Sequence, residues 1–307
     1  MQKQQTYNIL WRYAKIKGVV TQNISDKFWV SHAGREFECF GKKNLKTSKI
    51  CVGDMVEICE VDGAFQISKQ YPRHNFLIRP PVANIDKLFI VVCAVPEPDF
   101  FVVDKMILFA YVNGIEPIIL VNKVDEFGFD LFENLKSVYQ NVCQIFCVSA
   151  RSGYNINVLK EAMHSSICAF AGQSAVGKSS LVNSLIPTLS QKVGEISQKI
   201  ERGKNTTTHC KLCEVEQDSY IIDTPGFSLI DEYYLPIKYD ELSSFYPDFL
   251  QYAEGCKFKN TCDHINERQS DCMVKQKVAE GEIDVGRYER YKQIYDGLKM
   301  RWKNEHR

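Results

Sequence analysis

The amino-acid sequence predicts a multi-domain protein with three parts in chain order: an N-terminal OB-type β-barrel, a central α/β domain, and a mainly helical C-terminal domain. Three observations predict this class. Short alternating apolar runs with glycine-bearing turns fill residues 18–71, longer apolar runs separated by segments of helical length fill residues 87–172, and the chain after Leu235 is polar, aromatic and cysteine-bearing. The expected boundaries are 1–72, 73–234 and 235–307.

The composition is that of an ordinary globular protein. The chain has 307 residues, of which 45% are hydrophobic, and its 38 basic and 38 acidic residues balance, so total charge does not indicate a partner. No apolar run has the length of a signal peptide or a membrane span, which predicts a cytoplasmic protein without a membrane partner. Twelve cysteines in such a chain predict reduced thiols and a metal site, because a disulfide framework needs an oxidising compartment.

The barrel is expected from the runs "KFWVSH", "REFECFG", "DMVEICEVD" and "GAFQISKQ". Residues 1–75 hold twelve Lys or Arg and seven acids. The aromatic residues interleaved with these charges include Trp11, Tyr13, Phe28 and Trp29. This composition favours a barrel that binds a nucleic-acid backbone and stacks bases. The alternative places the aromatic rings in the barrel core and leaves the lysines merely solvated.

The central domain begins after a proline-bounded segment, residues 71–81, which reads as a linker. The runs "KLFIVVCAV", "EPIILVNKVD", "QIFCVSA" and "SICAFAG" are apolar along their whole length, as buried parallel strands are. Helix-length segments separate them. This β-α-β succession predicts a doubly wound sheet covered by helices.

A phosphate-binding loop follows the last of these runs. The stretch "GQSAVGKSS" matches G-x-x-x-x-G-K-[ST], with a strand before it and a helix after it. The residues expected to bind the nucleotide are Gly172, Gln173, Ser174, Ala175, Val176, Gly177, Lys178, Ser179 and Ser180. Backbone N–H groups would surround the phosphates, Lys178 would neutralise the β- and γ-phosphates, and Ser179 would bind Mg²⁺. The motif predicts a nucleoside triphosphate with Mg²⁺.

Two further elements fit the same site. In "SYIIDTPGF", Asp223 would reach Mg²⁺ through water and the Gly226 amide would meet the γ-phosphate. Between this strand and the loop lies "ERGKNTTTHC", the composition of a γ-phosphate-sensing switch, with Thr207 favoured as the Mg²⁺ ligand. Thr206 and Thr208 are close rivals, and an ordinary surface loop is the alternative.

A base-reading motif predicts which nucleotide binds. In "NKVD", Asp125 would accept from the two adjacent N–H donors of guanine, a pair that adenine lacks, so ATP is disfavoured. Asn122 would brace the loop or meet the base, and Lys123, followed by Val124, would lie along the base face. The pair Ser149 and Ala150 closes the next strand, where a backbone N–H can donate to the guanine carbonyl.

The order of these motifs is unusual. The base-reading motif and the Ser-Ala loop precede the phosphate loop, the threonine switch and D-T-P-G. This resembles a GTPase whose usual order is circularly permuted, and a permutation keeps the site because strands can be reconnected at surface loops. The central domain is therefore expected to be a circularly permuted P-loop GTPase domain.

The C-terminal part carries a metal motif. Its cysteines and histidine are spaced C-x5-C-x-H-x7-C, at Cys256, Cys262, His264 and Cys272. Three thiolates and one imidazole predict one closed structural Zn²⁺ site. The pair in "CKLC", residues 210–213, is interpreted as structural. Residues 285–307 hold seven Lys or Arg and three acids with interspersed aromatic residues, which suits either RNA or a docked helix with a solvated face.

Together these parts resemble the ribosome small-subunit-dependent GTPase A (RsgA) family over nearly the whole chain. The stretches "PRHNFLIRPPVANIDKLFIV", "GQSAVGKSSLVN" and "CMVKQKVAEGEI" carry the resemblance. It implies a bacterial factor that binds the small (30S) ribosomal subunit and its ribosomal RNA late in maturation. It also implies slow GTP hydrolysis that the subunit stimulates, and release of another assembly factor. We expect a monomer with GTP or GDP, Mg²⁺ and Zn²⁺.

Several residues depart from the family pattern. The metal spacing is longer by one and by two residues. The family's switch histidine, proposed to act in hydrolysis, is replaced by Asn205, and Phe227 follows D-T-P-G. An amide cannot become a charged acid or base, so we expect weak intrinsic hydrolysis, with His209 or ribosomal RNA as a substitute. Ala175 stands where the family often has glycine, which costs little if its φ is negative.

Two other functions compete with a ribosome-stimulated GTPase. An RNA-associated assembly scaffold that binds GTP with negligible hydrolysis is favoured by Asn205. An ATPase acting on nucleic acid is opposed by Asp125.

Overall fold

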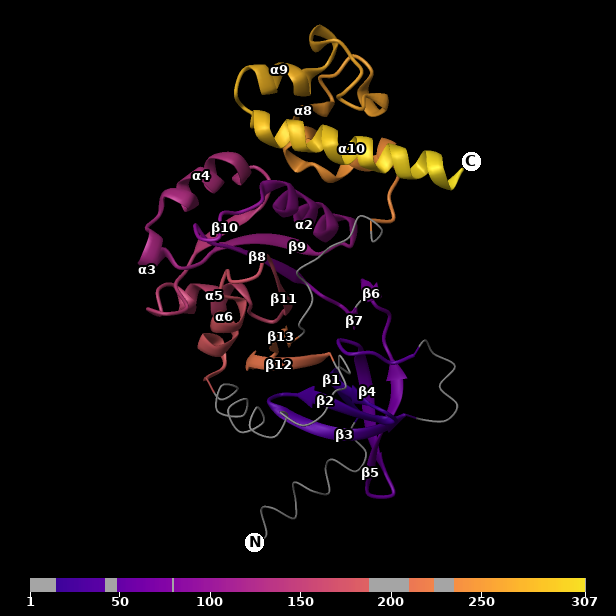
Figure 1. The fold of residues 1–307 in the computed structure, drawn as a ribbon. Coiled ribbons are helices and arrows are strands. Elements are labelled where there is room, and N and C mark those ends of the chain that lie inside the picture. The colour runs from indigo at the N-terminus through magenta and orange to yellow at the C-terminus, as the bar shows by residue number, and fades with distance from the viewer. Residues whose placement is uncertain (1–14, 42–48, 79, 188–209, 224–234, 307) are drawn as a thin grey trace. The chain divides into compact units, whose positions relative to one another are not determined.

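The structure is a computed structural model of the chain that describes residues 15–41, 49–78, 80–187, 210–223 and 235–306 (Figure 1). Contacts between residues divide the chain into two compact units. The first unit comprises Met1–Leu88, Ile156–Phe170 and Ser179–Phe227, and the second comprises Phe89–Asn155, Ala171–Lys178 and Ser228–Arg307.

A five-stranded barrel begins the first unit. Its strands are β1 (Ile16–Ile24), β2 (Lys27–His32), β3 (Arg35–Gly41), β4 (Met55–Val61) and β5 (Ala64–Gln70). They follow one another in the order β1-β2-β3-β5-β4, and pairing of β1 with β4 closes the barrel. The β3–β5 pair is parallel and the other pairs are antiparallel, which is the Greek-key closure of an OB barrel.

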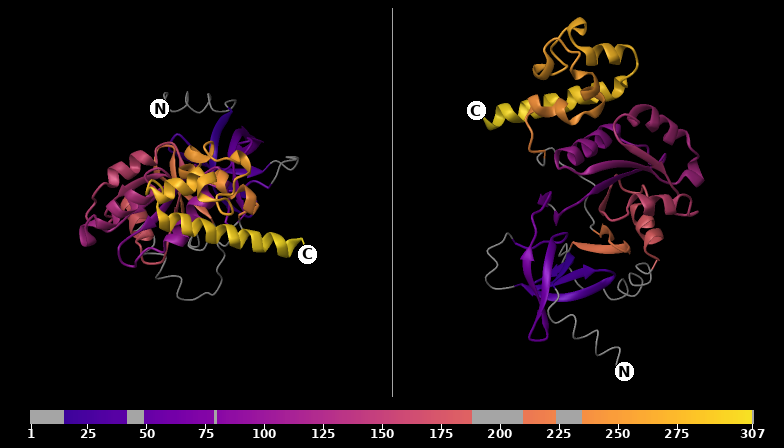
Figure 2. Two further views of the ribbon diagram at one scale, coloured as in Figure 1. Left: turned by 90° about the horizontal axis from the view of Figure 1, so that it is seen from above. Right: turned by 180° about the vertical axis from the view of Figure 1, so that it is seen from behind.

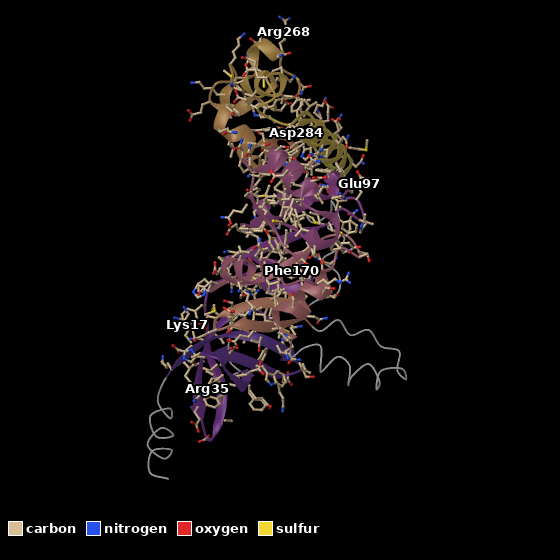
Figure 3. All side chains as sticks on the ribbon, turned by 90° about the vertical axis from the view of Figure 1, so that its left-hand side faces the viewer. Lys17, Arg35, Glu97, Phe170, Arg268 and Asp284 are labelled. Atoms are coloured by element: carbon tan, nitrogen blue, oxygen red, sulfur yellow. The ribbon has the colours of Figure 1, made fainter. Side chains whose placement is uncertain are left out.

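The barrel core is aliphatic. Its buried residues are Ile16, Val20, Val30, Cys39, Ile50, Val56, Ile58 and Ile67, and Phe28, Phe37 and Phe65 pack against them. Phe28 therefore belongs to the core margin, while the neighbouring Trp29 is half-buried on the alternate face of β2. Charged side chains such as Lys17 and Arg35 lie on the barrel surface (Figure 3).

The proline-bounded segment after the barrel is more ordered than a linker. It contains a small antiparallel hairpin of β6 (Phe76–Ile78) and β7 (Pro81–Ala83). Asn84 donates its Nδ2 to the Gly53 carbonyl at 2.9 Å, which ties the hairpin to the barrel. Gly53 has a φ of +86°, and a Cβ there would lie 2.0 Å from the Ala83 carbonyl oxygen, so only glycine permits this approach.

The rest of the first unit extends the barrel strands into a sheet. Its elements are α5 (Ile156–Ala162), β11 (Ile167–Ala171), α6 (Lys178–Leu185), β12 (Lys211–Glu216) and β13 (Ser219–Asp223). Strand β11 is parallel to β13, β12 is antiparallel to β13, and β12 pairs with β1 through Lys211 and Gln22. The barrel and this hairpin therefore share backbone hydrogen bonding.

The second unit begins with alternating strands and helices. They are β8 (Lys87–Val92), α2 (Phe100–Val112), β9 (Glu116–Val121), α3 (Val124–Phe127), α4 (Asp130–Tyr139) and β10 (Gln144–Cys147). The strands follow the order β10-β9-β8, with β9 and β10 parallel. Residues 118–121 of β9 are all buried, as expected for a strand covered on both faces.

Short helices and one long helix complete the second unit. They are η2 (Tyr239–Phe245), α8 (Pro247–Ala253), η3 (Lys259–Thr261), η4 (Gln269–Asp271), α9 (Met273–Ala279) and α10 (Val285–Glu305). Figure 2 shows α10 as the yellow helix that ends near the C-terminus. Its N-cap is Asp284, whose side chain accepts from the Arg287 backbone N–H at 2.7 Å. Within the described ranges, no helix combines the length and apolar character needed to cross a membrane.

Candidate functional site

The phosphate loop leaves β11 and enters α6, and packing explains both of its outer glycines. Gly172 has a φ of +137°, and a Cβ there would lie 2.2 Å from the Val91 carbonyl oxygen. Gly177 has a φ of +98°, and a Cβ there would lie 2.3 Å from Nδ2 of Asn122. Any side chain at either position would therefore push the loop away from the strands that hold it.

Lys178 turns back into its own loop. Its Nζ donates to the carbonyl oxygens of Gly172 at 2.6 Å and Gln173 at 2.7 Å. Burial lowers the pKa of the Lys178 ammonium. The ammonium is thus held at the centre of the loop, where it can meet phosphate oxygens.

Alanine at position 175 was expected to cost little free energy relative to glycine if its φ were negative, and this condition is not met. Its φ is +67°, in the left-handed region. An L-residue in this region carries a steric cost of about 1–2 kcal/mol, which glycine avoids. The phosphate loop of this chain is therefore strained at one exposed residue.

Asn122 connects three of the predicted motifs. It is 2% exposed at the end of β9. Its Nδ2 donates to the Val176 carbonyl in the phosphate loop at 2.9 Å, and its Oδ1 accepts from the Ala150 N–H at 3.2 Å. Both polar atoms of the amide are used, so the side chain braces the loops and does not face solvent.

The residues after Asn122 form a tight turn into α3. Lys123 has a φ of +64°, and its Nζ donates to the Val95 carbonyl at 3.2 Å. Val124 is buried, and its N–H donates to the Val148 carbonyl at 3.4 Å. This arrangement leaves Asp125 exposed in the first turn of α3, where its carboxylate can accept from a base.

The loop after β10 is held by its own serine. Ser149 is fully buried, and its Oγ accepts from the Ser152 N–H at 2.9 Å. Ala150 is half-buried and is positioned by its bond to Asn122. The base-reading loop, the Ser-Ala loop and the phosphate loop therefore lie together.

Of the other residues predicted to bind the nucleotide, the structure describes some and not others. Ser179 and Ser180 are exposed in the first turn of α6. Asp223 is the last residue of β13, opposite Lys211 of β12. Other predicted switch residues lie outside the described residues: Asn205, Thr206, Thr207, Thr208, His209, Gly226 and Phe227.

The predicted metal ligands converge at one point. Cys256, Cys262, His264 and Cys272 are buried, and their ligand atoms all lie within 4.8 Å of one another. Two Sγ–Sγ separations are 3.8 and 3.9 Å, and Nδ1 of His264 lies 3.3–3.7 Å from the three sulfurs. A tetrahedron with Zn–S bonds of about 2.3 Å has S–S edges of about 3.8 Å, so the donor set and its dimensions fit Zn²⁺.

The protonation tendencies of this cluster also fit a metal. Burial raises the pKa of the Cys262 and Cys272 thiols and lowers the pKa of the His264 imidazole. Without a cation, burial therefore favours neutral groups. A dication would offset the cost of burying thiolates.

Three tyrosines of α10 bind residues 263–264, which we call the metal loop, so the terminal helix docks through these aromatic residues. Tyr288 donates to the His264 carbonyl at 2.6 Å, Tyr291 to the Asp263 carbonyl at 2.7 Å, and Tyr295 to Oδ2 of Asp263 at 2.8 Å. All three rings are buried. Aromatic residues that could have suggested RNA stacking thus donate to Asp263 and to the predicted metal ligand His264.

Sequence reasoning missed a buried charge cluster, which we call the arginine cluster: Arg287 and Arg290 of α10, Asp104 of α2 and Asp248 of α8. Arg287 is 1% exposed; it donates to Asp248 at 2.7 and 3.1 Å and also to Asp104. Arg290 pairs with Asp104 and donates to Tyr139 Oη at 3.3 Å. No local pattern indicates this cluster, because Arg287 lies 39 and 183 residues from its two partners.

Comparison with known proteins agrees with this geometry. The RsgA GTPase family model matches residues 70–232. A protein of Ruminiclostridium cellulolyticum named small ribosomal subunit biogenesis GTPase RsgA is 35% identical over 291 residues, which cover 92% of this chain and 93% of that protein. The chain belongs to the RsgA GTPase family.

Other members extend this match. The RsgA of Clostridium acetobutylicum is 35% identical and covers 93% of this chain and 99% of its own. The crystal structure of YjeQ from Thermotoga maritima has a TM-score of 0.77 at 31% identity, covering 93% and 99% of the two chains. YloQ, described as a circularly permuted GTPase, has a TM-score of 0.76 at 27% identity, covering 94% and 97%.

Membership in the RsgA family confirms the predicted fold class and activity. The N-terminal barrel, the central circularly permuted GTPase domain and the C-terminal region with its Cys/His cluster are those expected. The protein is a GTP hydrolase.

Proposed function

We propose that this GTPase binds the small ribosomal subunit and assists its late maturation, hydrolysing GTP slowly alone and faster on the subunit. The observation that carries the proposal is the chain-long similarity to proteins named small ribosomal subunit biogenesis GTPase, which spans 92–94% of this chain in three such relatives. The similarity therefore includes the barrel and the metal-binding region as well as the GTPase domain.

The proposal includes the setting in which the protein works. It acts in the cytoplasm as a monomer, and ribosomal RNA forms part of its contact with the subunit. The surplus of basic residues in residues 1–75 supports contact between the barrel and RNA. We propose domain boundaries at 72/73 and 234/235.

The nucleotide is proposed to bind at the loops that Asn122 braces. Residues 172–180 surround the phosphates, with Lys178 neutralising them, and Asp125 accepts from guanine. The Ala150 N–H donates to Asn122. This bond holds the Ser-Ala loop next to the base-reading motif, where it would lie beside the base. Mg²⁺, when bound, would neutralise charge on the β- and γ-phosphates, and Ser179, Thr207 and Asp223 are the residues proposed to hold it.

Hydrolysis is proposed to depend on groups that the subunit brings into place. Asn205 can hold a water molecule by hydrogen bonding but cannot take its proton as a base. Gly226 would donate its N–H to the γ-phosphate. The proposed zinc ion, held by Cys256, Cys262, His264 and Cys272, has no place in the reaction, because four protein ligands close its coordination.

Nucleotide-dependent sedimentation with purified small subunits tests the proposed partner. The protein is mixed with a non-hydrolysable GTP analogue, with GDP, or with no nucleotide, and is pelleted through sucrose with small or large subunits. We expect pelleting with small subunits that is strongest with the GTP analogue and weak with GDP. Equal pelleting with small and large subunits, in every nucleotide state, would contradict the proposal.

A further inference from the structure

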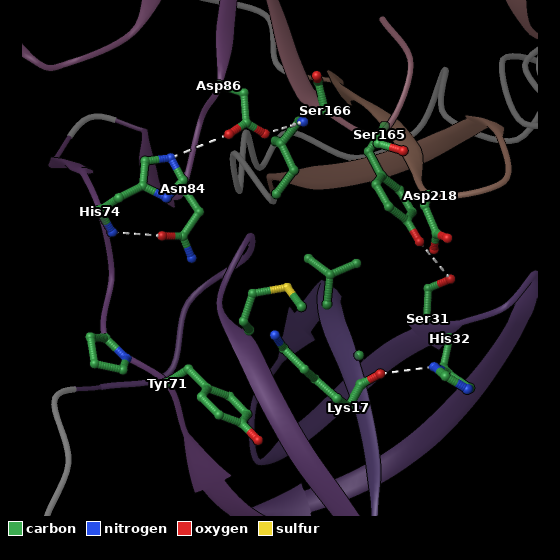
Figure 4. Close-up of a pocket in the computed structure, with 16 residues that line it drawn as sticks. Lys17, Ser31, His32, Tyr71, His74, Asn84, Asp86, Ser165, Ser166 and Asp218 are labelled. Atoms are coloured by element: carbon green, nitrogen blue, oxygen red, sulfur yellow. Dashed lines mark hydrogen bonds and ion pairs between the residues drawn. The ribbon is translucent and has the colours of Figure 1, made fainter.

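We propose that a cavity beside the barrel is a second nucleotide-binding site, which takes one nucleoside monophosphate unit, either free or within an RNA strand. The cavity has a volume of about 400 Å³ and lies within the first unit (Figure 4). No phosphate-loop residue lines it. The inference deepens the proposed function and rests on it for the RNA source, because the proposed partner is built on RNA.

The size of this cavity indicates a ligand. Cavities that hold small molecules have volumes of about 300–1,000 Å³, whereas a single buried water needs only about 10–15 Å³. The barrel contributes β1 and β2, the chain after β5 contributes Tyr71 and His74, and the turns before β11 and β13 contribute Ser165 and Asp218. Elements that are distant in sequence therefore converge on one nucleotide-sized space.

The charges around the cavity are separated. Figure 4 shows Lys17 on the barrel side and Asp86 across the cavity from it, with Asp218 beside Ser31. Lys17 is exposed, so its ammonium can meet a phosphate. Carboxylates accept hydrogen bonds from the exocyclic amino groups of cytosine, adenine and guanine. A nucleoside monophosphate has both groups: a phosphate anion at one end, which Lys17 would meet, and a base amino group at the other, which a carboxylate would meet.

The middle of the cavity is apolar and aromatic. Val19, Met55 and Ile167 line it together with the Tyr71 ring. Lys17 Nζ lies 5.0 Å from the centroid of that ring. Lys69 Nζ also lies over that ring, 4.6 Å from its centroid, so the ring places positive charge beside the cavity, and the aliphatic side chains suit the flat face of a base.

The polar groups of the cavity are held in place before any ligand arrives. Asp86 accepts from the Ile167 N–H at 2.7 Å through Oδ2, and its Oδ1 lies 3.4 Å from Nε2 of His74. The Tyr220 hydroxyl donates to Ser31 Oγ at 3.0 Å. Groups fixed in this way lose little conformational entropy on binding.

The His32 ring has a defined orientation in the same wall. Its Nδ1 lies 2.8 Å from the Lys17 carbonyl, and because a carbonyl only accepts, Nδ1 carries the hydrogen. In the neutral ring Nε2 is therefore an acceptor. A nucleotide in this cavity would contact the barrel and the turn at Asp218 that joins β12 to β13.

Titration of the full-length protein with nucleotides tests the site. GDP and Mg²⁺ are kept saturating so that the phosphate loop is filled, and CMP, AMP, UMP and a five-nucleotide RNA are titrated by calorimetry and ligand-detected NMR. We expect one CMP or AMP per chain, and weaker UMP binding because uracil has no amino group.

Matched variants locate the binding. Lys17→Gln should weaken CMP or AMP binding at least tenfold, and Met55→Trp, which fills the cavity, should abolish it. Lys27→Gln removes the same charge from a neighbouring strand outside the cavity and should leave the affinity nearly unchanged. Circular dichroism and GDP affinity check that each variant is folded.

The outcomes separate the possible sources. Loss of both monophosphate and RNA binding in Lys17→Gln supports an RNA nucleotide, and monophosphate binding without RNA binding supports a free nucleotide. If none of the probes binds, or if Met55→Trp and Lys17→Gln bind like the parent, the site is wrong. Sedimentation with subunits is measured separately, so failure here is distinguishable from failure of the proposed function.

Discussion

Three residues of the phosphate loop have positive φ, and only two of them are glycines. Gly172 and Gly177 need this freedom because Val91 and Asn122 press against them. Ala175 also has a positive φ, +67°, although it is exposed. Strain at a nucleotide loop can be retained when the surrounding bonds determine the loop's shape.

Replacing Ala175 with glycine should stabilise the protein. We expect Ala175→Gly to raise the free energy of unfolding by up to about 1 kcal/mol, because relief of left-handed strain exceeds the added entropy of glycine in the unfolded chain. Urea unfolding measures this change. Ala33→Gly is the control, since Ala33 has a φ of +48° in a barrel turn. If Ala33→Gly raised the free energy of unfolding and Ala175→Gly lowered it, the proposed strain at Ala175 would be wrong.

Asn122 is the residue on which the arrangement of the nucleotide loops depends. We expect Asn122→Ala to weaken GDP binding at least tenfold, because it removes the bonds to Val176 and Ala150 and leaves buried groups unpaired, at about 1–3 kcal/mol. Fluorescent GDP titration measures the affinity. Asn113→Ala removes a comparable amide bond, to Phe109, and should leave GDP affinity unchanged. Equal losses in both variants would refute the bracing role.

At the scale of elements, helix α10 contacts both the metal loop and helix α2 within the second unit. Its tyrosines hold residues 263–264, and Arg287 and Arg290 reach Asp104 in α2. The arginine cluster has two positive and two negative charges, so it is neutral as a whole. Removing one member would leave a buried charge without a partner.

The arginine cluster should therefore be costly to break. We expect Asp104→Asn to lower the free energy of unfolding by about 3–5 kcal/mol, measured by urea unfolding. Glu289→Gln breaks the exposed Lys292–Glu289 pair of the same helix and should cost less than about 1 kcal/mol. If the two variants lowered the free energy of unfolding by similar amounts, the buried pairs would contribute no more stability than a surface pair.

The β12–β13 hairpin should lose stability at alkaline pH through Tyr220. Burial raises the pKa of Tyr220 from 10.0 to about 12. The folded state therefore keeps this proton while the unfolded chain loses it, so stability is fully present below pH 10 and falls as pH rises to about 12.

Replacing the hydroxyl should reduce this pH dependence. We expect Tyr220→Phe to have a shallower decline of unfolding free energy above pH 10 than the parent. Tyr111→Phe is a parallel case, because burial also raises the pKa of Tyr111 to about 12. A decline as steep as the parent's in both variants would contradict the assignment.

Local patterns predict many elements accurately and long-range contacts poorly. The alternating runs fall on β2, β3, β4 and β5 because side-chain periodicity is a local property. The β6–β7 hairpin was expected to be a linker, since its order depends on Asn84 reaching Gly53, 31 residues earlier. The arginine cluster was missed for the same reason, and the φ of Ala175 has no signature in the sequence.

At the scale of the whole molecule, motif order is what the sequence predicts best. The base-reading motif precedes the phosphate loop in the chain, yet Asn122 contacts Val176, 54 residues later. A circular permutation keeps the site while changing the connections. The last predicted switch, D-T-P-G, consequently leads into the region that carries the Cys/His cluster, whereas in an unpermuted order it would be followed by the base-reading strand.

We propose that GTP hydrolysis by this protein responds to the small ribosomal subunit. The most direct test is single-turnover hydrolysis of labelled GTP by the full-length protein, with and without purified small subunits, with Lys178→Ala as the blank. We expect slow hydrolysis alone, a rise of at least tenfold with small subunits and no rise with large subunits. Unchanged hydrolysis on small subunits, with GTP and subunit binding intact, would contradict it and favour a GTP-binding scaffold.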